Sequence, residues 1–315
     1  MERFEFLSSD GKTQLAAYCL RPAGEIRGML QISHGMCEYF LRYEAFAEYL
    51  AKDGWLVFGH DHLGHGNSAP SEDDLGFIAS KGGKDYMVSD ILNLARQMQK
   101  QYPNIPTVLF GHSMGSFLSR AVLTREEAKD ENGELIYIAS VICGTGGPDM
   151  PTGAGTLLAN LIALLRGERH RSRLLASIAF AGYLSRIEKP CDQSAWLTRD
   201  SAVVEQYNAD PFCHYTFTVR AYRDLFDAVA EVSRKDWAAK VPSNLPLLLI
   251  SGEDDPVGGF GKGVEKIHDR LLRAGAKRTT CVLYPQMRHE ILNEIDKETV
   301  WKETLEWLNR CLLPT

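Results

Sequence analysis

The fold is decided by the stretch Thr107-Val108-Leu109-Phe110-Gly111-His112-Ser113-Met114-Gly115. Residues 107–110 are short and apolar, which predicts a buried strand, and a helical pattern runs from Met114 to Glu127. Ser113 would then lie on a tight turn between a strand and a helix, in the pattern G-x-S-x-G. The flanking glycines let neighbouring backbone pass close by, and the free N–H groups of the helix N-terminus point toward developing negative charge. The stretch therefore predicts a nucleophilic serine at position 113.

The same alternation of short apolar segments and helical patterns continues on both sides of this stretch. Further strand candidates are residues 29–33, 55–59, 138–143, 247–250 and 280–284. Helical patterns cover residues 43–52, 86–101, 263–274 and 297–311. Short apolar strands that alternate with helices are typical of a parallel sheet covered on both faces. We therefore predict an α/β fold with a mostly parallel central sheet flanked by helices.

The alternation stops after Gly147 and returns only after Pro242 and Pro246. Residues 148–235 contain helical patterns and loops without a convincing strand candidate. We therefore expect one α/β core, made of residues 1–147 and 236–315, with residues 148–235 as a helical insertion.

Serine is a poor nucleophile unless a base lies next to it. Where the serine follows a strand in this way, the acid and then the histidine come later in the chain. The histidines after Ser113 are His170, His214, His268 and His289. Only His289 lies in a loop just past a core strand candidate, so we expect it to be the general base.

The acid should follow the strand candidate at residues 247–250. Three acids compete in that loop: Glu253, Asp254 and Asp255. An acid bonded to the imidazole would fix its tautomer and stabilise the imidazolium. The spacing alone does not choose among the three.

A second loop, His34-Gly35-Met36-Cys37, follows the strand candidate at residues 29–33. A loop in this position supplies one of the two donors of an oxyanion hole. We expect the backbone N–H groups of Met36 and Met114 to hold the oxyanion, and Gly35 to contact the substrate. We interpret His34 as a structural histidine that braces the loop.

Several other classes of protein are disfavoured by composition. The formal net charge of −6 argues against a nucleic-acid-binding protein. The seven cysteines are scattered and form no C-x-x-C pair, which indicates reduced thiols in a cytoplasmic protein. No secretion signal is evident at the N-terminus, and the apolar stretch at residues 157–165 is shorter than the ~20 residues that cross a bilayer. The pattern specifies no oligomeric state.

The segment His60-x-His62-x-x-His65 has the spacing of some zinc ligands. Related metal motifs carry aspartate where this chain has Gly64, and no second set of ligands is evident. We interpret the segment as a hydrogen-bonded histidine loop and expect neither a metal nor a cofactor.

Taken together, these stretches resemble the monoacylglycerol lipase and lysophospholipase-like α/β-hydrolases, which are also similar to some serine aminopeptidases. The resemblance covers nearly the whole chain, and its most specific part is D-H-x-G-H-G-x-S at residues 61–68. The other matching stretches are His34-Gly35-Met36, Gly111–Gly115, Gly252-x-x-Asp255 and Arg288-His289-Glu290. A bacterial subset is resembled further at Trp196–Asp200 and Tyr207–Cys213.

The resemblance implies an α/β-hydrolase fold in which residues 148–235 form a helical cap, or lid, over the active site. It also implies that Asp255 is the triad acid, because the family places the acid three residues after the glycine. Trp196 and Phe212 lie in the stretches shared with the bacterial subset and are expected to contact the substrate. The chain departs from the family at Met36-Cys37, where smaller residues are common.

Residues 156–165 are apolar almost all round a helix, and Asn160 is their only interior polar residue. A helix at a protein surface normally has one apolar stripe and one polar face. We expect Leu158 and Leu161 to line an acyl pocket and the segment to contact anionic lipid surfaces weakly. The alternative is a wholly buried helix followed by a solvated basic loop. The basic residues after the helix are Arg166, Arg169, Arg171 and Arg173.

These features predict a serine carboxyl-ester hydrolase that forms an acyl-enzyme on Ser113. Its substrates would be small-molecule or lipid esters such as monoacylglycerols or lysophospholipids. The first alternative is a serine aminopeptidase, which needs a carboxylate in the insertion for the substrate amine, and Glu205 and Asp210 are available there. The second alternative is a catalytically dead ligand receptor, which should have lost a triad member.

Overall fold

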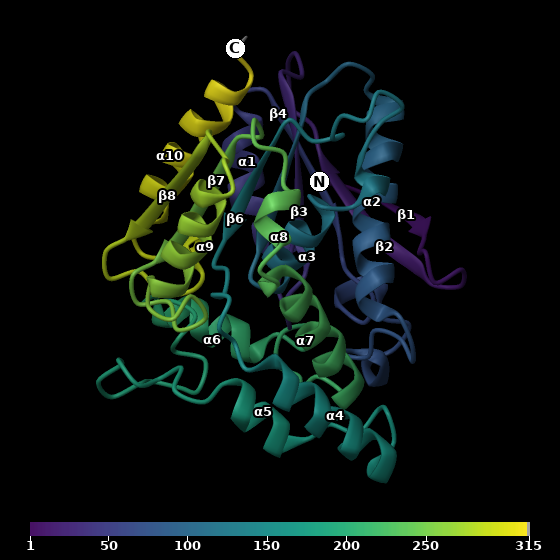
Figure 1. Ribbon diagram of the computed structural model, residues 1–315, viewed down its shortest axis with the longest axis vertical. Helices are drawn as coiled ribbons and strands as arrows, with labels where there is room; N and C mark the ends of the chain where they lie inside the picture. Colours follow the sequence, from purple (N-terminus) through teal and green to yellow (C-terminus); the bar gives the residue numbers. More distant parts are fainter. Residues whose placement is uncertain (314–315) are drawn as a thin grey trace.

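An eight-stranded sheet runs through the centre of the computed structural model, which describes residues 1–313 (Figure 1). The strand order is β1-β2-β4-β3-β5-β6-β7-β8. The pairings from β4 to β8 are parallel, whereas β1 and β2 join antiparallel at one edge. The strands are β1 (Glu2–Leu7), β2 (Gln14–Leu20), β3 (Gly28–Ser33), β4 (Trp55–His60), β5 (Thr107–His112), β6 (Ala139–Cys143), β7 (Leu247–Gly252) and β8 (Thr279–Tyr284). The predicted α/β fold with a mostly parallel sheet is confirmed.

β1 and β2 were not among the predicted strands. In β1, Phe4 and Phe6 alternate with Arg3 and Glu5, which is the period-two pattern of an edge strand with one wet face. This short alternation of apolar and polar residues is the sequence feature from which β1 could have been predicted. β5 and β7 also run two residues farther than predicted, so β5 ends at His112, directly before Ser113.

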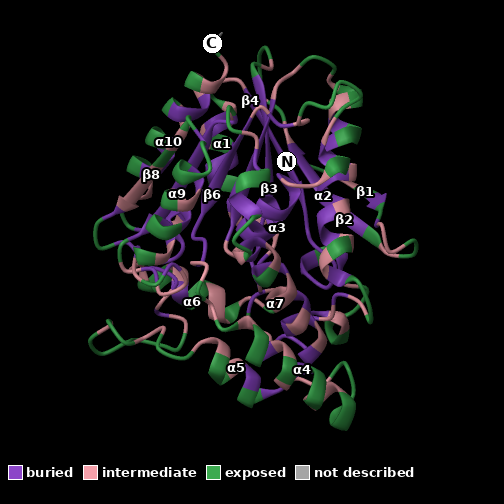
Figure 2. Ribbon diagram, viewed as in Figure 1, coloured by how far each residue is buried: buried purple, intermediate pink, exposed green. Residues whose placement is uncertain are grey.

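Helices cover both faces of the sheet, and each face has its own hydrophobic core. α1 (Glu44–Ala51) and α10 (Lys297–Cys311) pack on one face. The opposite face carries α2 (Gly83–Gln101), α3 (Met114–Val122) and α9 (Lys262–Arg273). Figure 2 shows the central strands buried and the outer sides of the helices exposed. Short 3₁₀ turns are η1 (Phe40–Tyr43), η2 (Gly66–Ser68), η3 (Glu72–Asp74), η4 (Glu126–Ala128) and η5 (Ile291–Asn293).

The chain between β6 and β7 contains helices and no strand. These helices are α4 (Thr152–Arg166), α5 (Arg173–Ala179), α6 (Ser201–Ala209), α7 (Val219–Ser233) and α8 (Trp237–Lys240). α4 packs against α7, and a Cβ on Gly155 would lie 2.7 Å from the Phe226 ring, so glycine is needed for this close approach.

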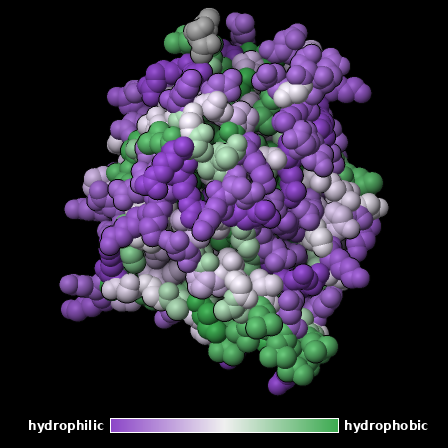
Figure 3. Space-filling model, viewed as in Figure 1, coloured by the Kyte–Doolittle hydropathy of each residue, from purple (hydrophilic) through white to green (hydrophobic). Residues whose placement is uncertain are grey.

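The outer side of α4 and α5 is apolar and exposed, and it forms the hydrophobic area at the bottom of the view in Figure 3. We call this the leucine face. It consists of Leu157, Leu161, Leu164, Leu165, Leu174 and Ile178, each more than half exposed. The alternative of a wholly buried helix at residues 156–165 is therefore wrong. None of the helices within residues 1–313 has the length and apolar content needed to cross a bilayer.

Four histidines are buried together at the ends of β3 and β4: His34, His60, His62 and His65. The ring centroids of His34 and His62 lie 4.3 Å apart, and His34 Nε2 accepts the backbone N–H of His62 at 2.9 Å. Burial lowers the pKa of His34 and His60 to about 3 and that of His65 to about 4. Across residues 1–313, no group of three or more His, Cys, Asp or Glu side chains could hold a metal ion.

The buried histidines make stability depend on pH, and His60 tests this because its ring nitrogens have no hydrogen-bond partner among residues 1–313. A depressed folded-state pKa means that the stability is present above the unfolded pKa of about 6.5 and is lost as the pH falls below it. We expect His60→Phe to lose roughly 1 kcal/mol less unfolding free energy than the natural chain between pH 7.5 and 5.5, measured by urea unfolding. The control Ile142→Val should lose as much unfolding free energy over this pH range as the natural chain. An equal loss in His60→Phe would contradict the lowered pKa of His60.

Candidate active site

Ser113 occupies a strained turn between β5 and α3. Its φ of 52° and ψ of −119° are rarely adopted by residues other than glycine. The backbone N–H of Ser113 donates to the Cys143 carbonyl at 3.0 Å, which ties the turn to the neighbouring strand. α3 begins at Met114, so the first N–H groups of this helix have no carbonyl one turn earlier to bind.

His289 and Asp255 meet at the carboxyl ends of β8 and β7. The His289 Nδ1 and Asp255 Oδ1 atoms lie 3.0 Å apart, and both side chains are almost fully buried. Burial raises the pKa of Asp255, but the histidine and the donors Ser251 Oγ and Val257 N outweigh it and lower the pKa overall. Asp255 therefore stays ionised at neutral pH. The other ring nitrogen, His289 Nε2, has no hydrogen-bond partner among residues 1–313.

Of the three acids in the loop after β7, only Asp255 contacts His289. Asp254 is partly exposed, and its Oδ1 lies 3.7 Å from Arg186 Nη1. Glu253 is exposed to solvent. The structure thus places at His289 the acid that the family resemblance selected, which spacing alone had left open.

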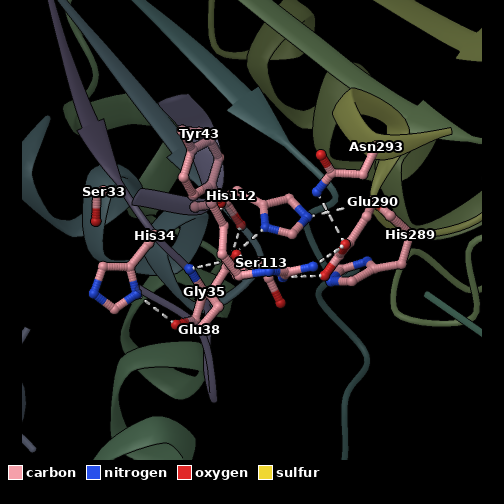
Figure 4. Close-up of polar contacts among 12 residues, drawn as sticks. Ser33, His34, Gly35, Glu38, Tyr43, His112, Ser113, His289, Glu290 and Asn293 are labelled. Carbon is pink, nitrogen blue, oxygen red and sulfur yellow. Dashed lines mark hydrogen bonds and ion pairs between the residues drawn. The ribbon is translucent and has the colours of Figure 1, made fainter. Parts of the chain in front are cut away.

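The loop after β3 approaches the serine closely. A Cβ on Gly35 would lie 2.9 Å from Ser113 Cβ, so a side chain at position 35 would crowd the turn. The Gly35 N–H donates to Glu38 Oε1, which holds the loop in place. Met36 and Met114 both line the cavity that contains Ser113 and His289. Figure 4 shows Ser113 between this loop and His289.

The cavity at Ser113 has a volume of about 450 Å³. Its wall is mainly apolar and is built by α3, α5, α7 and the loops before and after them. The apolar residues that sequence analysis did not foresee include Phe117, Met150, Ala176, Phe180, Leu225, Phe226 and Val229. No periodic signal singled these residues out, because they come from separate segments that only the folded chain brings together.

Of the residues Trp196, Leu158, Leu161 and Phe212, which were predicted to bind substrate, only Trp196 lines the cavity. Trp196 lines the cavity, and its ring centroid lies 5.0 Å from that of His289. Leu158 and Leu161 do not line the cavity, so that expectation is wrong. Leu158 packs against the core, and Leu161 is 52% exposed on the leucine face. Phe212 packs against the Tyr39 ring outside the cavity wall.

The family of the chain follows from comparison with known proteins. A family model described as "Serine aminopeptidase, S33" matches residues 24–296. The chain belongs to this family. Among curated relatives, the monoglyceride lipase of Rattus norvegicus is 31% identical over 92% of this chain and 88% of its own length. The monoacylglycerol lipase of Mycolicibacterium smegmatis is 25% identical over 91% of this chain and 90% of its own length.

Solved structures agree with this family assignment. A thermostable carboxyl esterase from Bacillus coagulans superposes with a TM-score of 0.90 at 27% identity, over 99% of both chains. A lipase in an open form gives a TM-score of 0.88, also at 27% identity over 99% of both chains. This S33-family chain is therefore an α/β-hydrolase and an ester hydrolase, which confirms the resemblance to monoacylglycerol lipases.

Proposed function

We propose that this hydrolase cleaves monoacylglycerol-type acyl esters through an acyl-enzyme on Ser113. The observation that supports this best is the hydrogen bond between His289 Nδ1 and the ionised Asp255. Nε2 has no hydrogen-bond partner among residues 1–313, and both His289 and Ser113 line the cavity. His289 Nε2 takes the proton from Ser113 Oγ as Oγ bonds to the ester carbonyl carbon. The N–H groups of Met36 and Met114 hold the oxyanion. The proton then passes from His289 to the departing alcohol oxygen.

Deacylation repeats the same steps with water. His289 accepts a proton from a water molecule as its oxygen bonds to the acyl carbon, and the proton returns to Ser113 Oγ when the acid is released. Asp255 stabilises the imidazolium in both halves because it is ionised and buried against the ring. No step requires a cofactor.

The cavity favours an ester of a long-chain acid as the substrate rather than a peptide. A volume of about 450 Å³ with a mainly apolar wall suits an acyl chain. An aminopeptidase needs an unengaged carboxylate for the substrate amine. Glu205 is exposed and Asp210 binds Tyr39 Oη at 2.7 Å, and neither lines the cavity. The carboxylates in the cavity wall, Glu38 and Glu290, already bind His112 and Arg42.

We propose further that residues 148–235 act as a cap that contacts lipid surfaces through the leucine face. A large exposed apolar area is unusual on a protein that contacts only water. Arg166 and Arg173 lie beside this face and form no ion pair within residues 1–313. Two of the four arginines have other roles, since Arg169 pairs with Asp74 at 2.8 Å and Arg171 donates to the Leu75 carbonyl at 2.7 Å.

The proposed mechanism predicts the cost of losing each triad member. Ser113→Ala should lower kcat for a p-nitrophenyl ester by roughly six powers of ten, because the triad acts as a unit. Asp255→Asn should lower kcat about ten-thousand-fold, because the amide favours the wrong tautomer of His289. The matched control Asp254→Asn should change kcat less than threefold. Residual activity above one per cent in Ser113→Ala would place the nucleophile elsewhere.

The cavity wall predicts where acyl chain length is set. Leu225→Trp should fill part of the acyl site and lower kcat/KM for twelve-carbon esters at least tenfold relative to four-carbon esters, since larger side chains in a packed site force a misfit. The control Leu161→Trp adds the same bulk on the leucine face and should leave this ratio unchanged. A shift in Leu161→Trp without one in Leu225→Trp would mean that the acyl chain binds outside the cavity.

The leucine face predicts binding to vesicles. Exchanging Leu161, Leu164 and Leu165 together for glutamine should weaken co-flotation with phosphatidylglycerol vesicles roughly a hundredfold, at about 1 kcal/mol for each leucine. Leu272→Gln, an exposed leucine on α9, serves as the control and should leave flotation unchanged. If the natural chain never floats, the leucine face has another role.

A further inference from the structure

Four ionisable side chains lie together next to the proposed triad: Glu38, His112 and Glu290 are buried, and Arg42 is nearly so. Arg42 binds both oxygens of Glu290, with its Nη1 at 2.6 Å and its Nη2 at 2.8 Å. Arg42 Nη1 also lies 3.3 Å from Glu38 Oε2, and His112 Nδ1 lies 2.9 Å from Glu38 Oε1. We call these four residues the charge network, and most of it is visible in Figure 4.

The charge network connects the three segments that carry the proposed oxyanion donor Met36, the nucleophile Ser113 and the base His289. Glu38 accepts the Gly35 N–H, next to the proposed oxyanion donor. His112 directly precedes Ser113, and Glu290 directly follows His289. These loops follow β3, β5 and β8, which are not all neighbours in the sheet, so strand pairing alone does not set the distances between them.

The charge network also contacts His289 directly. The His112 ring centroid lies 4.7 Å from the His289 ring, and His112 Nε2 lies 3.4 Å from the His289 carbonyl. Asn293 Nδ2 donates to Glu290 Oε2 at 3.1 Å, and Tyr43 Oη donates to Glu38 Oε1 at 2.9 Å. The carboxylate oxygens of Glu38 and Glu290 and both ring nitrogens of His112 therefore have partners within the protein.

The groups of the charge network shift one another's pKa values. Burial raises the pKa of Glu38, but His112 and Arg42 outweigh it and lower the pKa overall. Burial lowers the pKa of His112, and Glu38 outweighs this and raises it. The pKa of Glu290 is lowered by Arg42 against the effect of burial. Glu38 and Glu290 thus face the Arg42 guanidinium, and Glu38 also faces an imidazole whose pKa it raises. A buried ion pair of this kind resists displacement because separating it leaves an uncompensated charge.

We propose that Glu38, Arg42, His112 and Glu290 are positioning residues that set the distances between the oxyanion loop, Ser113 and His289. The inference rests on the proposed roles of Ser113 and His289. Misplacing reacting groups by about 1 Å costs roughly a hundredfold in rate. A network that only stabilised the fold would change the melting temperature and leave the chemical step unaltered.

The test separates these two roles with the double variant Arg42→Met/Glu290→Gln, which removes one cation and one anion together. We expect each single variant to melt well below the natural chain, because one buried charge is left unpaired. The double variant should regain most of the melting temperature, yet its kcat for a p-nitrophenyl ester should stay about a hundredfold low with KM changed less than threefold. The rate of Ser113 labelling by a fluorophosphonate probe should fall in parallel.

The matched control removes an ion pair whose two side chains do not line the cavity. Lys84 and Glu231 form a half-buried pair between α2 and α7. Lys84→Met/Glu231→Gln should leave kcat unchanged. Arg42→Lys provides a second test if the double variant does not fold. It keeps the charge but cannot bridge both Glu290 oxygens, and we expect kcat to fall about tenfold.

Two results would overturn the proposal: a folded double variant with natural kcat, whatever its melting temperature, or a folded Arg42→Lys chain with natural kcat. The activity of Ser113→Ala distinguishes failure of the proposed function from failure of the positioning role. If Ser113→Ala keeps its activity, the nucleophile assignment fails whatever the charge network does. If Ser113→Ala is inactive and the double variant is fully active, only the positioning role fails.

Discussion

The site depends on how closely α3 approaches the end of β3. A side chain at Gly115 would collide with the Ser33 carbonyl, and one at Gly111 would collide with the Ser119 hydroxyl. Because both positions lack a Cβ, the helix can start directly beside the sheet, and Ser113 is held at a positive φ between them. Such backbone strain costs about 1–3 kcal/mol and persists only where the surrounding packing imposes it. Here that packing is a fully buried strand on one side and a fully buried helix on the other.

This close approach brings the N-terminus of α3 and the loop after β3 to one edge of the sheet, where the loops after β7 and β8 also emerge. Parallel strands place their carboxyl ends at the same edge, so residues far apart in the chain meet there. β7 and β8 are neighbours, which accounts for the contact between Asp255 and His289. The sheet does not fix the position of that pair relative to the loop after β3, and the side chains of Glu38, Arg42, His112 and Glu290 connect the two.

The parts of the structure that sequence reasoning could predict are those with a local signal. Buried parallel strands are short apolar runs, and the turn at Ser113 carries its own glycines, so both were recognisable. The acid was different, because Glu253, Asp254 and Asp255 have the same local chemistry and only the family resemblance separated them. The cavity wall had no such signal. Leu158 and Leu161 were placed in it wrongly because the apolar residues 156–165 define no preferred face, and the side that is buried is set by the fit of Gly155 and Ala159 against α7.

The helix α5 shows how the proposed cap can serve two surfaces at once. Ala176 and Ala179 line the cavity, whereas Leu174 and Ile178 on the same helix are more than half exposed. Small residues on the inner side leave room for an acyl chain, and large ones on the outer side suit contact with lipid. Phe180, at the end of α5, lies 5.8 Å from the Trp196 ring, and Trp196 in turn packs against His289. Trp196 thus connects α5 to His289 through two aromatic contacts, so that a displacement of α5 on a lipid surface would reach the proposed base.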